Sequence, residues 1–299
     1  MSFKPYDLSV NDIFSGNRRY KIPNYQREFS WENENFDDFY NDLIKSSKLS
    51  LENTDINIEN KYFFGTILLL GVKESPNYDI PYEVIDGQQR LTTMTLFFAA
   101  IQDIIRNIST EYKTDFDERL FCKVTKSGQY IELERLVNNS LIPVLPVTIL
   151  NLNNLKNNGA KPNPDSYEKN WLLDAFEYIK KLLSKESFSV SLNIDIKSID
   201  DNIYLKLLDG LGKHLSNSTL ICIYHTNKAE ANILFRNLNY RGKPLSQVDL
   251  IKNEIFSIVE DSSKYASKTW KEIEDNVYES GENIFHRFLY HYMYGRYSK

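Results

Sequence analysis

The sequence is poor in the residues that bind catalytic metals or form disulfides. It contains two cysteines and four histidines among 299 residues. Cys122 and Cys222 lie far apart in apolar surroundings, which favours buried free thiols in a reducing cytosol. No two histidines stand four positions apart, and none has cysteine neighbours at zinc spacing. A serine nucleophile elbow and a Walker-type glycine loop are also missing, so the motifs of metal and serine hydrolases are not present.

Long apolar runs and an excess of positive charge are missing as well. The longest apolar run, residues 63–72 (FFGTILLLGV), is about half the length that a membrane-spanning helix needs. The amino terminus, MSFKPYDLSV, has none of the regions of a signal peptide. The net charge is −5, whereas proteins that hold DNA by general phosphate neutralisation are usually basic. We therefore expect a soluble, cytoplasmic protein with no membrane partner, and any contact with nucleic acid should be local.

The composition is otherwise that of a folded protein, with 41% hydrophobic and 13% aromatic residues. We expect an α+β core over residues 1–150 and a mainly helical region over 151–299 that packs on it. The Asn-, Gly- and Pro-rich segment 151–166 is the candidate boundary. The chain ends at HRFLYHYMYGRYSK without a helix-ending motif, which predicts a continuation into a further carboxy-terminal domain.

Apolar periodicity predicts where the main elements lie. Apolar residues recur at helical spacing over residues 34–48 and again from 88 to about 108. The runs 62–72 and 79–85 are typical of strands on either side of a loop, and 129–137 is a further candidate strand. Beyond the candidate boundary we expect a strand at 218–225 and helices at about 165–186, 200–214, 227–239, 246–259, 263–279 and 282–294.

The turn between the second strand and its helix has an unusual composition. Residues 82–98 read YEVIDGQQRLTTMTLFF, so an acid, a glycine, two amides and an arginine separate the two elements. A helix that begins at Gln88 has no intrahelical partners for its first amides, and together with the helix dipole these amides form an anion site. Gly87 permits a positive φ and leaves room for a ligand. Arg90, in the first turn, can bind two phosphate oxygens at once, and Gln89 adds an uncharged amide donor.

Asp86 is the exception in this turn, because a carboxylate repels phosphate. Two roles fit it: the N-cap of the helix, or a ligand of a Mg²⁺ ion that bridges it to phosphate. The alternative to an anion site is a capped helix with a solvated Arg90. Both interpretations fit the residues.

A second cluster, YQREFSW at residues 25–31, alternates aromatic and polar side chains. Tyr25 and Trp31 suit stacking on bases, while Gln26 and Arg27 suit phosphate pairing. The alternative is an aromatic patch that closes the core over the first helix.

A third cluster spans residues 229–256, where Gly242 and Pro244 end one helix and Ser246 caps the next. These three residues are explained by architecture. The polar residues left over are candidates for either structure or function: Glu230, Arg236, Asn237, Asn239, Arg241 and Lys252.

The three clusters, in this order, resemble one family, the GmrS-like amino-terminal domain of GmrSD-type modification-dependent restriction enzymes. The Asp-Gly-Gln-Gln-Arg signature of that family is intact here at 86–90, and the resemblance runs from about residue 8 to 260. The segment IPNYQREFSW is similar to the family's Tyr-Gln-Arg…Trp block. The segment FRNLNYRGKPLSQVDLIKNEIF is similar to its third block, carried here by Phe235, Leu238, Asn239, Gly242, Leu245, Ser246, Asp249, Leu250 and Lys252.

The resemblance implies a ParB/sulfiredoxin-like core that binds a nucleoside triphosphate (NTP) with Mg²⁺ and hydrolyses it. Asp86, Arg90 and Arg27 would take part in catalysis, with Asp86 as the metal ligand. The nucleotide-binding residues would be Tyr25, Gln26, Asp86, Gly87, Gln88, Gln89, Arg90, Asn239 and Lys252.

The resemblance further implies anti-phage defence, with modified or foreign DNA and a nuclease domain or subunit as partners. No His-Asn-His-type motif occurs in this chain, since HRFLYH has the wrong spacing, so nuclease activity is not assigned to it. The competing hypothesis is a nucleic-acid-binding sensor that places the turn on a backbone phosphate and hydrolyses nothing. The sequence is compatible with a homo-oligomer in either case.

Overall fold

The computed structural model describes residues 4–23, 26, 29–50, 61–74, 76–138 and 171–239, and, further on, residues 251, 255, 269–270, 272–273, 276 and 284–297. The chain forms two compact units. The first comprises Met1–Ile22 and Phe29–Thr226, and the second comprises Pro23–Glu28 and Asn227–Lys299. The predicted boundary near residue 150 lies outside the described residues and stays a prediction.

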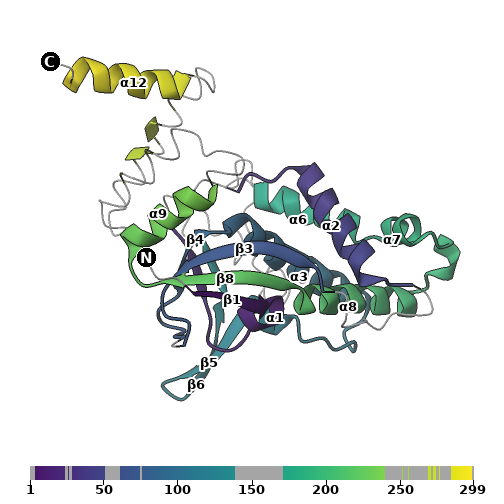
Figure 1. Ribbon diagram of the computed structural model, residues 1–299. Helices are drawn as coiled ribbons and strands as arrows, with labels where there is room; N and C mark the ends of the chain where they lie inside the picture. The colour runs from purple at the N-terminus through teal and green to yellow at the C-terminus, as the bar shows by residue number, and fades with distance from the viewer. Residues whose placement is uncertain are drawn as a thin grey trace. The chain divides into compact units, whose positions relative to one another are not determined.

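A mixed sheet forms the centre of the first unit (Figure 1). Its strand order is β1-β8-β3-β4-β2-β7. Strand β8 runs antiparallel to β1 and parallel to β3, and β4 runs antiparallel to β3 and parallel to β2. The strands are β1 (Lys4–Ser9), β2 (Tyr20–Ile22), β3 (Phe63–Leu70), β4 (Tyr82–Asp86), β7 (Leu136–Asn138) and β8 (Thr219–His225). A separate hairpin, β5 (Phe121–Lys126) with β6 (Gln129–Glu134), projects from the unit.

Helix α3 (Gln88–Ile108) is the longest helix of this unit and packs against α6 and α8. Helix α2 (Asn33–Ser47) contacts the same two helices. Its start is fixed by a capping box, in which the Asn35 side chain accepts a hydrogen bond from the Glu32 amide at 3.0 Å. The other helical segments are α1 (Val10–Ile13), α4 (Asp117–Leu120), α6 (Trp171–Leu182), α7 (Lys185–Leu192), the 3₁₀ turn η3 (Ile196–Ser198) and α8 (Asp201–Asn217).

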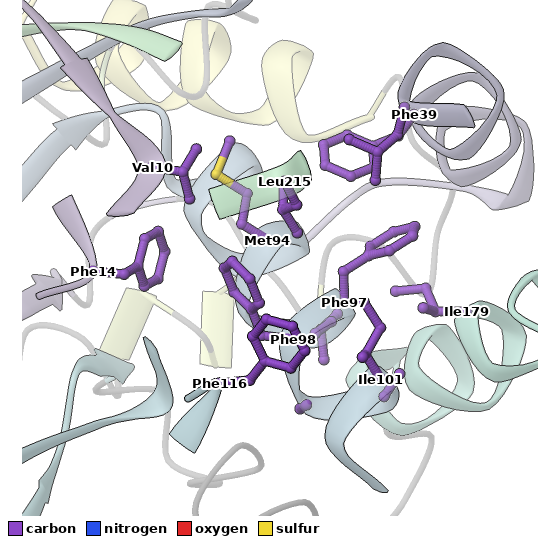
Figure 2. Packing of buried hydrophobic residues seen from close by; sticks show 14 of the residues in the cluster. Val10, Phe14, Phe39, Met94, Phe97, Phe98, Ile101, Phe116, Ile179 and Leu215 are labelled. Atoms are coloured by element: carbon purple, nitrogen blue, oxygen red, sulfur yellow. The ribbon is translucent and has the colours of Figure 1, made fainter. Parts of the chain in front are cut away.

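Aromatic side chains of α3 form the middle of the core (Figure 2). The Phe98 ring lies 5.9 Å from that of Phe14 and 5.8 Å from that of Phe116. At the preceding position of α3, the Phe97 ring lies 4.8 Å from the Phe39 ring on α2. Four of these five phenylalanines are fully buried, and the fifth, Phe39, is nearly so. Aromatic contacts at these distances add to the stabilisation that comes from burial.

In the second unit, α9 (Lys228–Asn239) and α12 (Ile284–Tyr297) are described. Four large aromatic side chains of α12 are exposed: Phe288, Tyr290, Tyr292 and Tyr294.

The predicted α+β class is confirmed, as are the helices at 34–48 and 88–108, which correspond to α2 and α3. The predicted end of the helix at 165–186 is wrong, because α6 stops at Leu182 and a second helix, α7, begins at Lys185. Ser184 causes this break, since its hydroxyl caps α7 by accepting a hydrogen bond from the Ser187 amide.

The short strands β1, β2 and β5 were not predicted as strands, and the ParB/sulfiredoxin likeness stays a prediction. The predicted features at 141–166 and 240–250 lie outside the described residues. Both cysteines are buried free thiols, as expected, and burial raises the pKa of Cys222 to about 12. No helix in the described part of the chain is long and apolar enough to cross a membrane.

Candidate functional site

The turn between β4 and α3 requires glycine for two independent reasons. Gly87 occupies the N-cap position with φ 93° and ψ 11°, a left-handed conformation that side chains disfavour. A Cβ atom at this position would also lie 2.4 Å from Cγ2 of Ile67 on β3. The first hydrogen bond of α3 runs from the Leu91 amide to the Gly87 carbonyl at 3.0 Å. The positive end of the helix dipole therefore begins directly at this corner.

Asp86 does not occupy the N-cap position of the helix. It is the last residue of β4, where it pairs with Leu68 of β3, and the N-cap position belongs to Gly87, which has no side chain. The N-cap interpretation of Asp86 is therefore wrong. Its role as a Mg²⁺ ligand stays a prediction.

Arg90 lies across β3, and a second glycine makes room for it. Its Nη1 atom donates a hydrogen bond to the Thr66 carbonyl at 3.1 Å. A Cβ atom at Gly65, where φ is +94°, would lie 3.3 Å from Nε of Arg90. The guanidinium is half-buried and, within the described part of the chain, forms no ion pair with a carboxylate. Its charge is consequently not neutralised by an internal partner there.

A pocket of about 260 Å³ opens beside Arg90. Its walls come from the segment before α2, from one face of α2 and from the start of β3. Asp38 and Asp42, one helical turn apart on α2, supply two carboxylates against the single guanidinium. The lining residues are Trp31, Asn35, Asp38, Phe39, Asp42, Tyr62, Phe63, Phe64 and Arg90. Five of these nine lining residues are aromatic, and the pocket has a negative side on α2 and a positive side at Arg90.

Tyr62 connects the two walls of this pocket. Its hydroxyl donates a hydrogen bond to Oδ2 of Asp42 at 2.6 Å. Burial, this hydrogen bond and the negative charges of Asp42 and Asp38 raise the pKa of Tyr62 to about 12. The phenol therefore keeps its proton at neutral pH and fixes the orientation of Asp42.

Gln89 joins the first two sequence clusters. Its Oε1 atom accepts a hydrogen bond from the Ser30 amide at 3.2 Å, and its Nε2 atom donates to the Ser30 hydroxyl at 3.5 Å. The next residue, Trp31, lines the same pocket as Arg90. The Trp31 ring also packs edge-on against the ring of Phe36, at 5.8 Å. One end of the aromatic cluster is thereby held next to the turn.

The structure brings the five residues of the turn together but does not place every predicted site residue beside them. Gln88 is 7% exposed and Gln89 is 8% exposed, so both side chains are mostly buried. Tyr25, Arg27 and Lys252 lie outside the described residues, as does the side chain of Asn239. Gln26 belongs to the second unit. For these residues, nucleotide binding stays a prediction.

Sequence reasoning missed Asp38, Asp42 and Tyr62. The i,i+4 spacing of the two aspartates was visible, but α2 was interpreted only through its apolar face. Nothing local shows that this polar side would meet Arg90, which comes from an element some fifty residues on. Among the described residues, no group of three or more His, Cys, Asp or Glu side chains could hold a metal ion by itself.

The sequence of this α+β protein matches a known class of domain, the amino-terminal domain of a restriction endonuclease. Residues 10–256 match the family described as GmrSD restriction endonuclease, N-terminal domain, and since this is most of the chain, the chain belongs to that family. The match includes all three sequence clusters. No curated protein matches the chain. Family membership places the chain in a DNA-acting restriction system that includes a nuclease domain.

Proposed function

We propose that this domain binds a nucleoside triphosphate with Mg²⁺ and hydrolyses it, and thereby regulates the cleavage of modified or foreign DNA in anti-phage defence. The observation that carries the proposal is the position of Arg90. Its guanidinium lines an open pocket whose other walls come from the segment before α2, from α2 and from the start of β3, and it has no carboxylate partner among the described residues.

The local electrostatics support phosphate at this place. The amino-terminal end of a helix favours anions, and a guanidinium binds two phosphate oxygens in a planar pair. Gly87 and Gly65 keep side chains away from the corner and from the guanidinium. The hydrogen bond from Arg90 to the Thr66 carbonyl holds the head group in place before a ligand arrives.

The carboxylates explain why a divalent cation should accompany the nucleotide. Asp38 and Asp42 outnumber Arg90 in the pocket, so a bare polyphosphate would be repelled. Mg²⁺ prefers oxygen ligands and usually keeps several waters, so a single carboxylate together with phosphate oxygens suits it. Asp86, which ends β4 one residue before the helix start, is our proposed protein ligand.

The proposal is tested by titrating a fluorescent NTP in the presence of Mg²⁺ against the wild type and Arg90→Ala. Removal of the charged two-oxygen contact should cost about 2 kcal/mol, or more than about tenfold in affinity. Arg106→Ala is the matched control, because Arg106 lies at the other end of α3 and pairs with Asp117. Equal affinities for the wild type and Arg90→Ala, with both proteins folded by circular dichroism, would reject the site.

The sensor hypothesis makes the opposite prediction: DNA binding that is sensitive to salt, survives without nucleotide and releases no phosphate. The two carboxylates beside Arg90 disfavour a bare DNA backbone at this pocket. A steady-state phosphate-release assay, run with and without DNA, separates the two functions.

A further inference from the structure

The pocket beside Arg90 is the right size for one part of a nucleotide. Its volume of about 260 Å³ is just below the roughly 300–1,000 Å³ of sites that enclose a whole small ligand. Three of the rings that line it are at least partly exposed, those of Trp31, Tyr62 and Phe63. The Phe63 ring is 51% exposed at the first position of β3. Partly exposed aromatic rings are the surfaces on which nucleic-acid bases stack.

The polar groups on the α2 side of the pocket are hydrogen-bond acceptors. The carboxylates of Asp38 and Asp42 can only accept hydrogen bonds when ionised. Asp42 already accepts one from Tyr62. Asp38 is exposed and has no hydrogen bond or ion pair with another described residue. The pocket therefore offers Asp38 as an acceptor that a ligand can use.

The two acceptor oxygens of one carboxylate discriminate among the bases, because each base presents a different pattern of donors and acceptors. Adenine and cytosine each place a ring nitrogen acceptor next to their amino group, and a carboxylate repels that acceptor. Uracil presents one N–H between two carbonyls. Guanine alone presents two adjacent donors, N1–H and the 2-amino group, which match the two oxygens of a carboxylate.

We infer that this pocket takes the guanine base of the nucleotide, and that Asp38 is the residue that recognises it. The inference rests on the proposed function, because the phosphates must be held by Arg90 and the start of α3 for the base to reach α2. Trp31 and Phe63 then provide the stacking surface. Asp42, held by Tyr62, lines the same wall one helical turn from Asp38.

The experiment compares four nucleoside triphosphates, those of guanine, adenine, cytosine and uracil, by competition against a fluorescent analogue with Mg²⁺. The wild type should bind the guanine nucleotide about tenfold or more tightly than the others, since a hydrogen bond to a charged group is the stronger kind. Asp38→Asn should lose this preference and gain affinity for xanthosine triphosphate. The amide of Asn accepts from xanthine N1–H and donates to its O2, which replaces the second donor of guanine.

The matched control is Glu34→Gln, which removes the same charge one turn earlier on α2, at an exposed position outside the pocket lining. It should leave the base preference unchanged. Thermal unfolding of each variant checks that the fold is intact.

The outcomes separate the two proposals. If Arg90→Ala weakens nucleotide binding but the wild type shows no preference for guanine, the base assignment is overturned and the proposed function stands. If the preference for guanine survives in Asp38→Asn, or is switched by Asp42→Asn instead, the assignment to Asp38 is overturned. If no nucleotide binds the wild type at all, both proposals fail.

Discussion

Helices α3 and α12 are both rich in apolar and aromatic residues, yet their environments are opposite. Most side chains of α3 are buried. In α12, every side chain whose exposure is described is exposed, including Tyr290 at 61% and Tyr294 at 62%. The composition of a helix therefore does not determine its burial, which depends on the elements that the fold places around it.

The exposed aromatic rings of α12 pair with one another along the helix. The ring of Phe288 stacks on that of Tyr292 at 6.1 Å, and Tyr290 stacks on Tyr294 at the same distance. Arg296 donates a hydrogen bond to the Tyr292 hydroxyl at 3.1 Å. Such i,i+4 pairs stabilise a helix by only about 0.2–0.5 kcal/mol each, whereas one buried aromatic residue in α3 contributes several times as much.

The largest expected difference between the two helices comes from truncating one ring in each. Phe98→Ala should lower the free energy of unfolding by about 3–5 kcal/mol, because it removes a fully buried ring that packs against Phe14 and Phe116. Tyr290→Ala should change it by less than about 0.5 kcal/mol. Urea unfolding followed by circular dichroism measures both values. Similar losses in the two variants would mean that α12 has a partner in the folded protein.

The same substitution of glycine by alanine should have opposite effects on stability at the N-cap of α3 and inside α12. Gly87→Ala should cost about 1–3 kcal/mol for the positive φ alone, and more because the new Cβ would overlap Ile67. Gly295→Ala, in α12, meets nothing within 4 Å and should favour the helix by about 0.5–1 kcal/mol. Unfolding midpoints give the first effect, and helical content gives the second. A Gly87→Ala variant as stable as the wild type would show that the corner relaxes without cost.

The smallest expected effect is on the pH dependence of stability. It compares a buried histidine of the first unit with an exposed histidine of α12. His214 on α8 is 1% exposed, its Nε2 lies 2.8 Å from the Ser46 hydroxyl oxygen, and burial lowers its pKa below the ordinary value of 6.5. The unfolded chain therefore takes up a proton before the folded protein does, as the pH falls below 6.5. Stability is complete above that pH and is lost as the pH falls through the folded-state pKa.

The measurement is the free energy of unfolding at about pH 7.5 and about pH 5.5. The wild type should lose more stability between these values than His214→Gln, by about 1.4 kcal/mol for each unit of pKa difference. His291→Gln, at an exposed position of α12, is the control and should behave like the wild type. An identical pH dependence in His214→Gln would assign the effect to other groups.

The parts of the fold that were predictable are those specified locally. Helix α3 was predicted from its apolar stripe, and its start at Gln88 followed from Gly87. Strand β1 was not predicted, because the alternation in KPYDLS is limited to Tyr6 and Leu8, and the segment becomes a strand through its pairing with β8. The order of the strands could not be predicted either, since it depends on contacts between residues far apart in the sequence.

The candidate site divides in the same way. The turn at Gly87 and Arg90 was predictable because one short segment contains all of its chemistry. Asp38 and Tyr62 were not, because they meet Arg90 only after α2 has packed beside β3. The bond between Gln89 and Ser30 joins two motifs that the sequence presented separately.

The position of β8 between β1 and β3 has a consequence for how this protein is made on the ribosome. Strand β3 is complete at residue 70, but its parallel neighbour is synthesised only at Thr219–His225. Until then the apolar FFGTILLL strand has an open edge, which is the kind of surface that chains use to aggregate. Strand β1 pairs only with β8 among the described strands. The first strand to leave the ribosome therefore cannot take its place in the sheet until more than two hundred further residues have followed it.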